Sequence, residues 1–412
     1  MKPDRVRRRI ARCLLAIVAL LPAVAAAQDD PALAHARELL TRVILVDGHN
    51  DLPWAIRSDK EHPNDLDAWD LRKPTRGDTD LARLRAGGVG AQFWSVYIPG
   101  EAAGGFARTQ LEQIELARRM IDRYPDALGF ATRSDEVLAE HRAGRIASML
   151  GIEGGHAIEN SLGVLRAYHA LGVRYMTLTH NTHTDWADAA AMVPPRHGGL
   201  TEFGVEIVRE MNRLGMIVDL AHTAEVTMHD ALDATQAPVM FSHANARAVC
   251  DVPRNVPDSV LRRLPDNGGV VMVTFVAGFV SQEVAKITQP AMARYRVMLQ
   301  KAKDEADRQR IYDEVFGKLV LPKVTIAQVA DHIDHVRKVA GVDHVGIGGD
   351  FDGNDLWPEG LTDVSMYPHL FAELIRRGWS DEDLGKLAGG NILRVMRTNE
   401  AVAARLQREK PL

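Results

Sequence analysis

Eight short apolar runs recur along this 412-residue chain, and each ends at a small cluster of polar residues. Several runs are continuous rather than alternating, which is typical of parallel strands covered on both faces. Helical patterns lie between the runs, and eight strands alternating with helices favour an α/β fold, the (β/α)8 TIM-type barrel. The expected strands are Val43–Asp47, Val89–Val96, Ala147–Ile152, Tyr175–Thr179, Met216–Leu220, Pro238–Phe241, Gly269–Phe275 and His344–Ile347.

The main alternative for alternating strands and helices is an open, doubly wound sheet. Such a sheet usually carries a glycine-rich phosphate turn, and we find none in the sequence. The chain exceeds the usual size of a barrel, and a charged, largely helical insertion at about 281–321 accounts for part of the excess. Because no linker or shift in composition divides residues 28–412, we expect them to form a single domain.

The first 27 residues have the pattern of a secretory signal peptide. Six basic residues precede or flank the start of an apolar run, which ends in Ala25-Ala26-Ala27. This run is short for a membrane span. We therefore expect residues 1–27 to be cleaved and the protein to be exported, to the periplasm or the medium. The C-terminal residues 407–412 are polar, unlike the apolar tail of a GPI signal, so we expect no stable membrane anchor after cleavage.

The charge of the chain argues against a nucleic-acid partner, and its cysteine content argues against a disulfide. The whole chain carries −5 at pH 7, and removal of the basic leader leaves −10. A mildly acidic protein lacks the basic footprint of nucleic-acid binding. Cys13 leaves with the leader and Cys250 remains alone, so no intrachain disulfide is expected.

Metal-ligand side chains follow five or more of the expected strands. His49 and Asp51 come after the first strand, two residues apart, and residues with this spacing in an extended segment point to the same side. The carboxyl ends of barrel strands converge on one face. We therefore expect a shared site made of His49, Asp51, Glu153, His180, His222, His243 and Asp350.

Nitrogen and oxygen donors of this kind suit Zn²⁺ or another borderline divalent ion. Even three histidines and two carboxylates of this set are too many for one tetrahedral site with an open position, and they fit two ions that share a bridging carboxylate. Such a centre activates water and polarises a carbonyl, which predicts hydrolysis of an amide or ester. Taken one at a time, each histidine could instead be a hydrogen-bonded core residue, and Arg254 could simply pair with Asp251 or Asp258.

Several motifs together resemble the membrane dipeptidase (renal dipeptidase, M19) family, in order over nearly the whole chain after the leader. They are Val46-Asp47-Gly48-His49-Asn50-Asp51-Leu52-Pro53, Gly151-Ile152-Glu153-Gly154-Gly155-His156, Thr177-Leu178-Thr179-His180, Asp219-Leu220-Ala221-His222, Phe241-Ser242-His243, Arg254-Asn255-Val256-Pro257-Asp258 and Gly348-Gly349-Asp350-Phe351-Asp352-Gly353. The resemblance implies a (β/α)8 barrel with a binuclear zinc site, two Zn²⁺ per chain.

The resemblance also implies a role for each residue. His49 and Asp51 would hold one zinc, Glu153 would bridge both, and His222 and His243 would hold the second. Glu153 would then also take part in catalysis, together with His180 and Asp350.

Three further residues would act on the substrate. His180 would stabilise the oxyanion, Arg254 would bind the C-terminal carboxylate of the substrate, and Asp350 would shuttle the proton beside the substrate amine.

The implied function is a zinc-dependent dipeptidase acting through a metal-bridging hydroxide. Its substrates would be small dipeptides, including those with a D-residue on the C-terminal side, and carbapenem-type β-lactams would be further substrates. Another binuclear metal amidohydrolase, such as a D-amino-acid deacetylase or a cyclic-amide hydrolase, is the alternative. A homodimer is an arrangement that the sequence leaves open.

Overall fold

The computed structural model describes residues 30–100, 105–192, 194–299, 301–302 and 305–409. The expected signal peptide over residues 1–27 lies outside the described residues and stays a prediction. Within the described residues, no helix is both long enough and apolar enough to cross a membrane.

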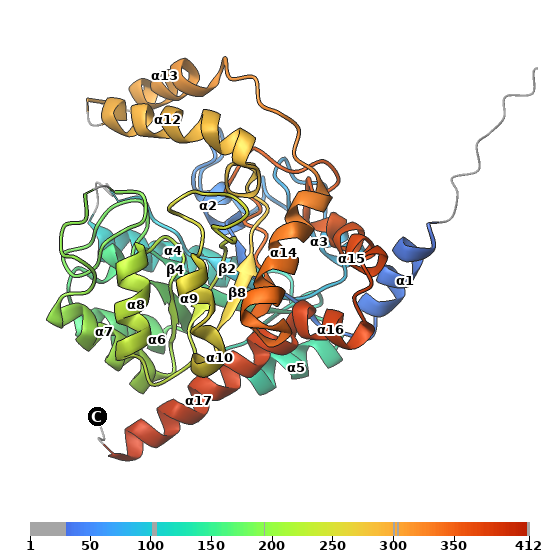
Figure 1. Cartoon of the computed structure of the whole chain (residues 1–412), viewed down its shortest axis with the longest axis horizontal. Helices are drawn as coiled ribbons and strands as arrows, with labels where there is room; N and C mark the ends of the chain where they lie inside the picture. Colours follow the sequence, from blue (N-terminus) through green and yellow to red (C-terminus); the bar gives the residue numbers. More distant parts are fainter. Residues whose placement is uncertain (1–29, 101–104, 193, 300, 303–304, 410–412) are drawn as a thin grey trace, which may run out of the picture.

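The described strands are all parallel and form one sheet, eight members of which close into a ring (Figure 1). The ring order is β2-β1-β9-β8-β7-β6-β5-β4, and β4 pairs back onto β2. The (β/α)8 barrel is therefore confirmed. The strands are β1 Leu45–Asn50, β2 Val89–Ser95, β3 Leu128–Phe130, β4 Ile146–Glu153, β5 Val173–Thr177, β6 Ile217–Asp219, β7 Met240–Phe241, β8 Val270–Val273 and β9 Val345–Ile347.

Strand β3 is the one that the sequence did not predict. It pairs with the first residues of β4, from Leu128 opposite Ile146 to Phe130 opposite Ser148. Strand β5 takes over as the partner of β4 from Leu150 onward. A three-residue strand is too short to show a period, so the pattern of apolar residues could not reveal it.

Helices surround the ring of strands (Figure 1). The expected insertion forms α12 and α13, which lie apart from the C-terminal helix α17 at the other end of the molecule. The helices are α1 Pro31–Leu40, α2 Leu52–Arg57, α3 Leu81–Ala86, α4 Phe106–Asp122, α5 Ser134–Arg142, α6 Leu162–Ala170, α7 Glu202–Leu214, α8 Glu225–Ala234, α9 Asp258–Leu261, α10 Leu264–Asn267, α11 Ala277–Val280, α12 Gln282–Leu299, α13 Glu305–Phe316, α14 Ile326–Ala340, α15 Tyr367–Arg376, α16 Asp381–Gly385 and α17 Asn391–Glu409.

Local signals in the sequence explain where the long barrel helices begin and end. Thr201 caps α7 by accepting a hydrogen bond from the backbone N–H of Gly204, and α7 ends at Gly215 in the left-handed conformation (φ 79°). Thr325 and Gln328 form a capping box at the start of α14. Both helices lie between strands of the barrel, where the sequence predicts helices.

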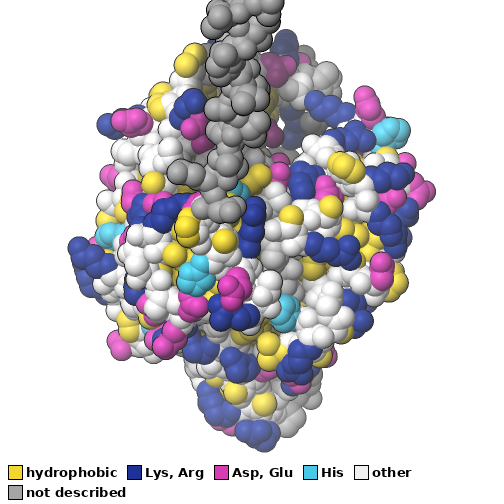
Figure 2. Space-filling view, turned by 90° about the vertical axis from the view of Figure 1, so that its right-hand side faces the viewer, with side chains coloured by type: hydrophobic (Ala, Val, Ile, Leu, Met, Phe, Trp, Pro, Cys, Tyr) yellow, Lys and Arg dark blue, Asp and Glu magenta, His cyan; other side chains and the backbone are white. Residues whose placement is uncertain are grey.

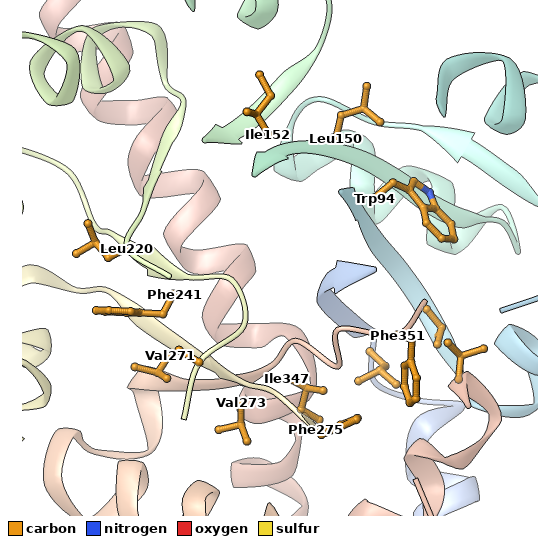
Figure 3. Packing of buried hydrophobic residues seen from close by; sticks show 14 of the residues in the cluster. Trp94, Leu150, Ile152, Leu220, Phe241, Val271, Val273, Phe275, Ile347 and Phe351 are labelled. Atoms are coloured by element: carbon orange, nitrogen blue, oxygen red, sulfur yellow. The ribbon is translucent and has the colours of Figure 1, made fainter. Parts of the chain in front are cut away.

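The strands separate the core into an inner and an outer layer, because successive side chains point to opposite faces. The outer layer lies between strands and helices, and Figure 3 shows part of it, including Leu150, Ile152, Val271 and Val273. The inner layer fills the barrel with Val46, Ala91, Phe93, Ala147, Met149, Tyr175, Ile217, Met240, Val270 and Met272.

Helix α17 contributes four further residues to the inner layer: Ile392, Leu393, Val395 and Met396. These side chains pack with the strand residues that point into the barrel. The helix therefore closes the amino-terminal end of the barrel, opposite the end at which the strands finish.

Charged side chains of both signs interleave on the face that Figure 2 shows, which is the side of α1, α15 and α16. Arg377, the residue that follows α15, takes part in a network of ion pairs. It contacts Asp331 and Asp334 of α14 at 2.7 and 2.8 Å, and Glu373 of α15 at 2.9 Å. Such a network ties neighbouring helices together, although each exposed pair contributes little by itself.

Two glycines let strand ends meet at the carboxyl end of the barrel. A Cβ at Gly348 would lie 1.9 Å from the carbonyl oxygen of Ser242, and a Cβ at Gly48 would lie 2.6 Å from the same oxygen. The ends of β1, β7 and β9 can therefore converge only because these positions lack a side chain.

We predict that Gly348→Ala destabilises the fold by about 1 to 3 kcal/mol, because the backbone around Ser242 must move to make room. Urea unfolding of the variant and of the unaltered protein measures this difference. Gly163→Ala is the control: Gly163 lies in α6, where the nearest atom to a Cβ is 3.5 Å away, and alanine should be neutral or slightly stabilising there. Equal stability of Gly348→Ala and Gly163→Ala would contradict the prediction.

Candidate metal centre

The residues predicted from the sequence lie where the barrel predicts them, at the carboxyl ends of strands. His49 belongs to the last part of β1, Asp51 follows that strand directly, and Glu153 is the last residue of β4. The other four stand in the loops after β5, β6, β7 and β9: His180, His222, His243 and Asp350.

Glu153 is the centre of the cluster. Its Oε1 lies 2.9 Å from Nε2 of His222 and 3.3 Å from Nε2 of His243. Its Oε2 lies 3.6 Å from Nε2 of His49. The two carboxylate oxygens therefore face two different sets of ring nitrogens.

The remaining distances complete two adjacent subsites. Nε2 of His49 lies 3.2 Å from Oδ2 of Asp51 and 3.9 Å from Oδ1 of Asp350. Nε2 of His180 lies 3.7 Å from Oε1 of Glu153. The ligand atoms fall within 4.8 Å of one another in three groups: His49, Glu153 and His243; Glu153, His180 and His222; and His49, Asp51 and Asp350. Distance alone thus does not separate His180 and Asp350 from the other five.

Two of these residues have left-handed backbones, which are uncommon for residues other than glycine. The φ angle is 63° at His222 and 67° at Asp350. The carbonyl of His222 accepts hydrogen bonds from the N–H of Ala190 at 2.8 Å and from Oγ1 of Thr179 at 3.1 Å. Neighbouring loops therefore hold the sharp turn that aims the His222 ring, and such local strain is characteristic of functional sites.

Asp219, at the end of β6, anchors the histidine side of the cluster. Its Oδ1 accepts the backbone N–H groups of Ala221 at 3.1 Å and of Ser242 at 2.8 Å. Its Oδ2 accepts the hydroxyls of Thr177 at 2.5 Å and of Ser242 at 2.6 Å. One buried carboxylate thus joins the ends of β5, β6 and β7.

Asp47 anchors the other side of the cluster, formed by His49 and Asp350, in the same way. Its Oδ1 accepts the N–H of His49 and the N–H of Gly349, both at 3.0 Å, and its Oδ2 accepts the hydroxyl of Tyr367 from α15. Asp47 therefore joins the ends of β1 and β9, the strands that lead to His49 and Asp350. Burial raises the pKa of Asp47 to about 6, although these donors and His49 oppose the shift.

The imidazoles of His222 and His243 are held in the neutral form that binds metal. Burial lowers the pKa of both rings well below the usual value, and the Arg254 guanidinium reinforces the shift. The hydroxyl of Ser242 donates to Asp219 and lies 2.8 Å from Nδ1 of His243, so Nδ1 must donate to Ser242 and Nε2 is free. Nε2 of His243 and Nε2 of His222 lie 3.0 Å apart.

The carboxylate side of the cluster attracts positive charge. Burial would lower the pKa of His49, but the neighbouring Tyr175, Asp51 and Glu153 raise that pKa well above the usual value. Burial would raise the pKa of Glu153, but the surrounding histidines lower it well below the usual value. The pKa of Asp350 is raised well above its usual value by burial, and the negative charges of Asp51 and Glu153 add to the shift.

These features fit a divalent cation. Nε2 of His49 and Oδ1 of Asp51 are buried and have no hydrogen-bond partner among the described residues. The unprotonated Nε2 of His243 lies 3.0 Å from Nε2 of His222, which is itself 2.9 Å from Glu153, so a cation could be bound by these three groups together. The donors are imidazole and carboxylate, which are the ligands of borderline divalent metals.

Arg254 borders the cluster and is 6% exposed. Its Nη2 donates to the carbonyl of His243 at 2.8 Å, and its Cζ lies 5.4 Å from the centre of the Phe279 ring. Its Nε and Nη1 have no hydrogen-bond partner among the described residues, and no ion pair with Asp251 or Asp258 is found there. Burial lowers the pKa of Arg254 to about 10, so the side chain stays charged at neutral pH.

Several residues around the cluster were not predicted from the sequence. Tyr175 contacts His49, Tyr367 contacts Asp47, and Phe279 lies beside Arg254. Tyr97 packs edge-on against His180, with ring centres 4.9 Å apart. None of these aromatic residues belongs to a distinctive pattern in the sequence, so only the folded arrangement reveals its contact.

Comparison with known proteins agrees with the barrel and the cluster. The sequence pattern described as membrane dipeptidase (peptidase family M19) matches residues 33–410. Dipeptidase verJ of Clonostachys rogersoniana is 41% identical over 389 residues, which cover 92% of this chain and 90% of that protein.

Solved structures show the same fold. The "probable dipeptidase PvdM" of Pseudomonas aeruginosa has a TM-score of 0.79 and 25% identity, and the match covers 91% of this chain and 100% of that one. A metallopeptidase of Rhodobacter sphaeroides, solved with a phosphinate mimic of the dipeptide L-Ala-D-Ala, has a TM-score of 0.70 and 24% identity over 87% of this chain and 99% of its own.

The family pattern spans almost the entire described chain, and a dipeptidase is 41% identical over nine-tenths of it. Together these matches show that the chain belongs to the membrane dipeptidase family of hydrolases, peptidase family M19.

Proposed function

We propose that this chain is a dipeptidase that works with two Zn²⁺ ions. His49 and Asp51 would hold one ion, His222 and His243 would hold the other, and Glu153 would be a ligand of both. The observation that carries the proposal is the position of Glu153, whose Oε1 lies 2.9 Å from His222 and whose Oε2 lies 3.6 Å from His49. When bound, two such ions bring the pKa of a water molecule close to neutrality and polarise the scissile carbonyl.

His180 supports the oxygen of the scissile carbonyl as negative charge develops on it. Its ring is 4.4 Å from the ring of His222 and 4.9 Å from that of Tyr97, so it is held at the edge of the cluster. A donor placed at this point is worth a few kcal/mol in the transition state, by analogy with oxyanion holes.

Asp350 moves the proton from the attacking water to the leaving amine. A carboxyl group serves in both directions when its pKa lies near the working pH, and burial raises the pKa of Asp350 toward that range. A side chain on Gly353 would lie 2.7 Å from Oδ1 of Asp350 and 2.2 Å from Oδ2 of Asp51, so glycine at this position keeps both carboxylates in the cluster.

Arg254 binds the free carboxylate at the C-terminal end of the substrate. Two of its N–H groups, on Nε and Nη1, are buried beside the cluster without a partner, and hydrogen bonds from a charged guanidinium to a carboxylate are strong. A fixed distance between this guanidinium and the scissile bond restricts the substrates to dipeptides.

The proposal extends to dipeptides with a C-terminal D-residue and to carbapenem-type β-lactams, which the family resemblance implies. The phosphinate mimic of L-Ala-D-Ala that binds the Rhodobacter sphaeroides protein is a matching inhibitor for this chain. An enzyme that prefers N-acyl D-amino acids or cyclic amides over dipeptides would instead be the alternative amidohydrolase.

Removal of metal should abolish activity, and Zn²⁺ should restore it. We expect two ions per chain, and we expect Glu153→Gln to lose at least one ion and roughly a thousandfold in kcat/KM, about 4 kcal/mol, because the shared negative ligand is gone. Metal analysis and dipeptide assays on the same samples test this. Glu140→Gln is the control, because Glu140 belongs to α5 and contacts Arg145 just before β4, away from the cluster. One ion per fully active chain would contradict the bridging role.

Arg254→Met should lower kcat/KM for free dipeptides about 100-fold, about 3 kcal/mol, because a buried charged contact is lost. The same variant should change the slow hydrolysis of a C-terminally amidated dipeptide by less than about threefold. A panel of L-L and L-D dipeptides, their amides, an N-acyl D-amino acid and a carbapenem provides the measurement, with Arg145→Met as the control. Equal losses for free and amidated dipeptides would show that Arg254 does not bind the carboxylate.

Asp350→Asn should lower kcat roughly 100-fold or more while the chain keeps two metal ions, because the amide cannot accept and return a proton. Steady-state kinetics and metal content of the same preparation separate the possible roles. If the variant loses an ion, Asp350 is a ligand rather than a proton shuttle.

A further inference from the structure

The phenol of Tyr175 reaches across the inside of the barrel to a residue of the metal cluster. Its hydroxyl lies 2.8 Å from Nδ1 of His49, and both side chains are fully buried. Tyr175 belongs to β5 and His49 to β1, and these strands are not neighbours in the ring. The contact is therefore a direct link between two non-adjacent strands through the interior of the barrel.

Gly151 of β4 makes this crossing possible. A Cβ at Gly151 would lie only 2.0 Å from Cζ of Tyr175 and 2.2 Å from Cε1. The ring also packs against Phe93 of β2, with ring centres 5.3 Å apart. The phenol is thus held in place from two strands, and its hydroxyl has a defined position before any ligand binds.

The contact also decides where the proton of His49 lies. Nε2 of His49 faces Asp51 and Glu153, so a cation bound there requires Nε2 to be free of its proton. The proton of the neutral ring then stands on Nδ1, which donates it to the Tyr175 hydroxyl. No other hydrogen bond to Nδ1 exists among the described residues.

The other two histidines of the cluster are supported differently. Nδ1 of His243 is oriented by Ser242 and Asp219, and Nδ1 of His222 has no hydrogen-bond partner among the described residues. Only the subsite of His49 and Asp51 therefore depends on a tyrosine. Groups that orient a metal ligand in this way typically change metal affinity by 10- to 100-fold when they are removed.

We propose that Tyr175 is a positioning residue of the metal centre: its hydroxyl fixes the ring angle and the proton of His49 and so strengthens binding of the ion held by His49 and Asp51. This inference rests on the proposed two-ion function. Tyr175 touches neither substrate nor metal, and it acts through His49.

Zinc titration of the metal-free chain, in competition with a chromophoric chelator, tests the inference. Tyr175→Phe keeps the ring and removes only the hydroxyl. Tyr168→Phe is the matched control, because the equally buried Tyr168 hydroxyl donates to the carbonyl of Ala157 at 2.9 Å, away from the cluster. We expect Tyr175→Phe to bind one ion with unchanged affinity and the other roughly 10- to 100-fold more weakly, while Tyr168→Phe binds both normally.

Two further variants test whether the loss of affinity belongs to the subsite of His49 and Asp51. Gly151→Ala displaces the phenol without removing its hydroxyl, and it should weaken the same ion. In an Asp51→Asn background, which already impairs that subsite, adding Tyr175→Phe should leave the affinity of the remaining ion unchanged. Thermal unfolding of the metal-free variants shows whether each one folds.

The outcomes are distinct. Unchanged affinities in Tyr175→Phe, or an equal loss for both ions, would overturn the role of Tyr175. If the unaltered chain binds only one ion, the two-ion function fails. In that case a 10- to 100-fold loss in Tyr175→Phe relative to Tyr168→Phe would still support the positioning role, and equal affinities would overturn it as well.

Discussion

Two buried carboxylates, Asp47 and Asp219, determine the geometry on which the rest of the site depends. Each accepts the backbone N–H of the residue two positions further along the chain and an N–H from just beyond the end of a neighbouring strand. A buried carboxylate is costly unless donors surround it, so each aspartate holds those strand ends at hydrogen-bonding distance. His49, His243 and Asp350 lie at or just beyond these strand ends, so the same hydrogen bonds fix their positions.

The cluster itself opposes stability in the absence of a cation. Asp51, Glu153 and Asp350 are buried close together, and the imidazoles around Glu153 compensate their charge only in part. Buried charges of one sign repel one another strongly at low dielectric constant. The barrel tolerates them because its layers of apolar side chains and the two anchoring aspartates fix the surrounding backbone. Local cost at a functional site, offset elsewhere in the fold, is common in enzymes.

The sequence predicts the barrel and the members of the cluster well, for a physical reason. A strand buried on both faces reads as an apolar run, so a histidine or carboxylate at its end stands out, as His222 and His243 do. The same logic could not separate His180 and Asp350 from the ligands, and the distances leave all seven residues together. Arg254 was singled out by the family resemblance alone.

What the sequence could not reveal depends on contacts between distant segments. Tyr175 looks like any other apolar residue of a strand, and only the closed ring brings it to His49. Tyr367 reaches Asp47 from a helix more than 300 residues away along the chain. Strand β1 also runs through Gly48 to Asn50, beyond the expected end at Asp47, because the convergence of strand ends extends the pairing.

The position of α17 has a consequence for the order of events during synthesis. The ring closes only when β9 pairs with β1, and four residues of α17 complete the interior of the barrel. The first strand therefore lacks one of its two partners until the last strand has been synthesised. The inner layer likewise stays open to water until the final helix has left the ribosome. Since such distant pairings form slowly, most of the chain is made before the native barrel can exist. A nascent chain of this kind remains unfolded long enough to be handled by other cellular machinery, and its metal ligands assemble only at the end.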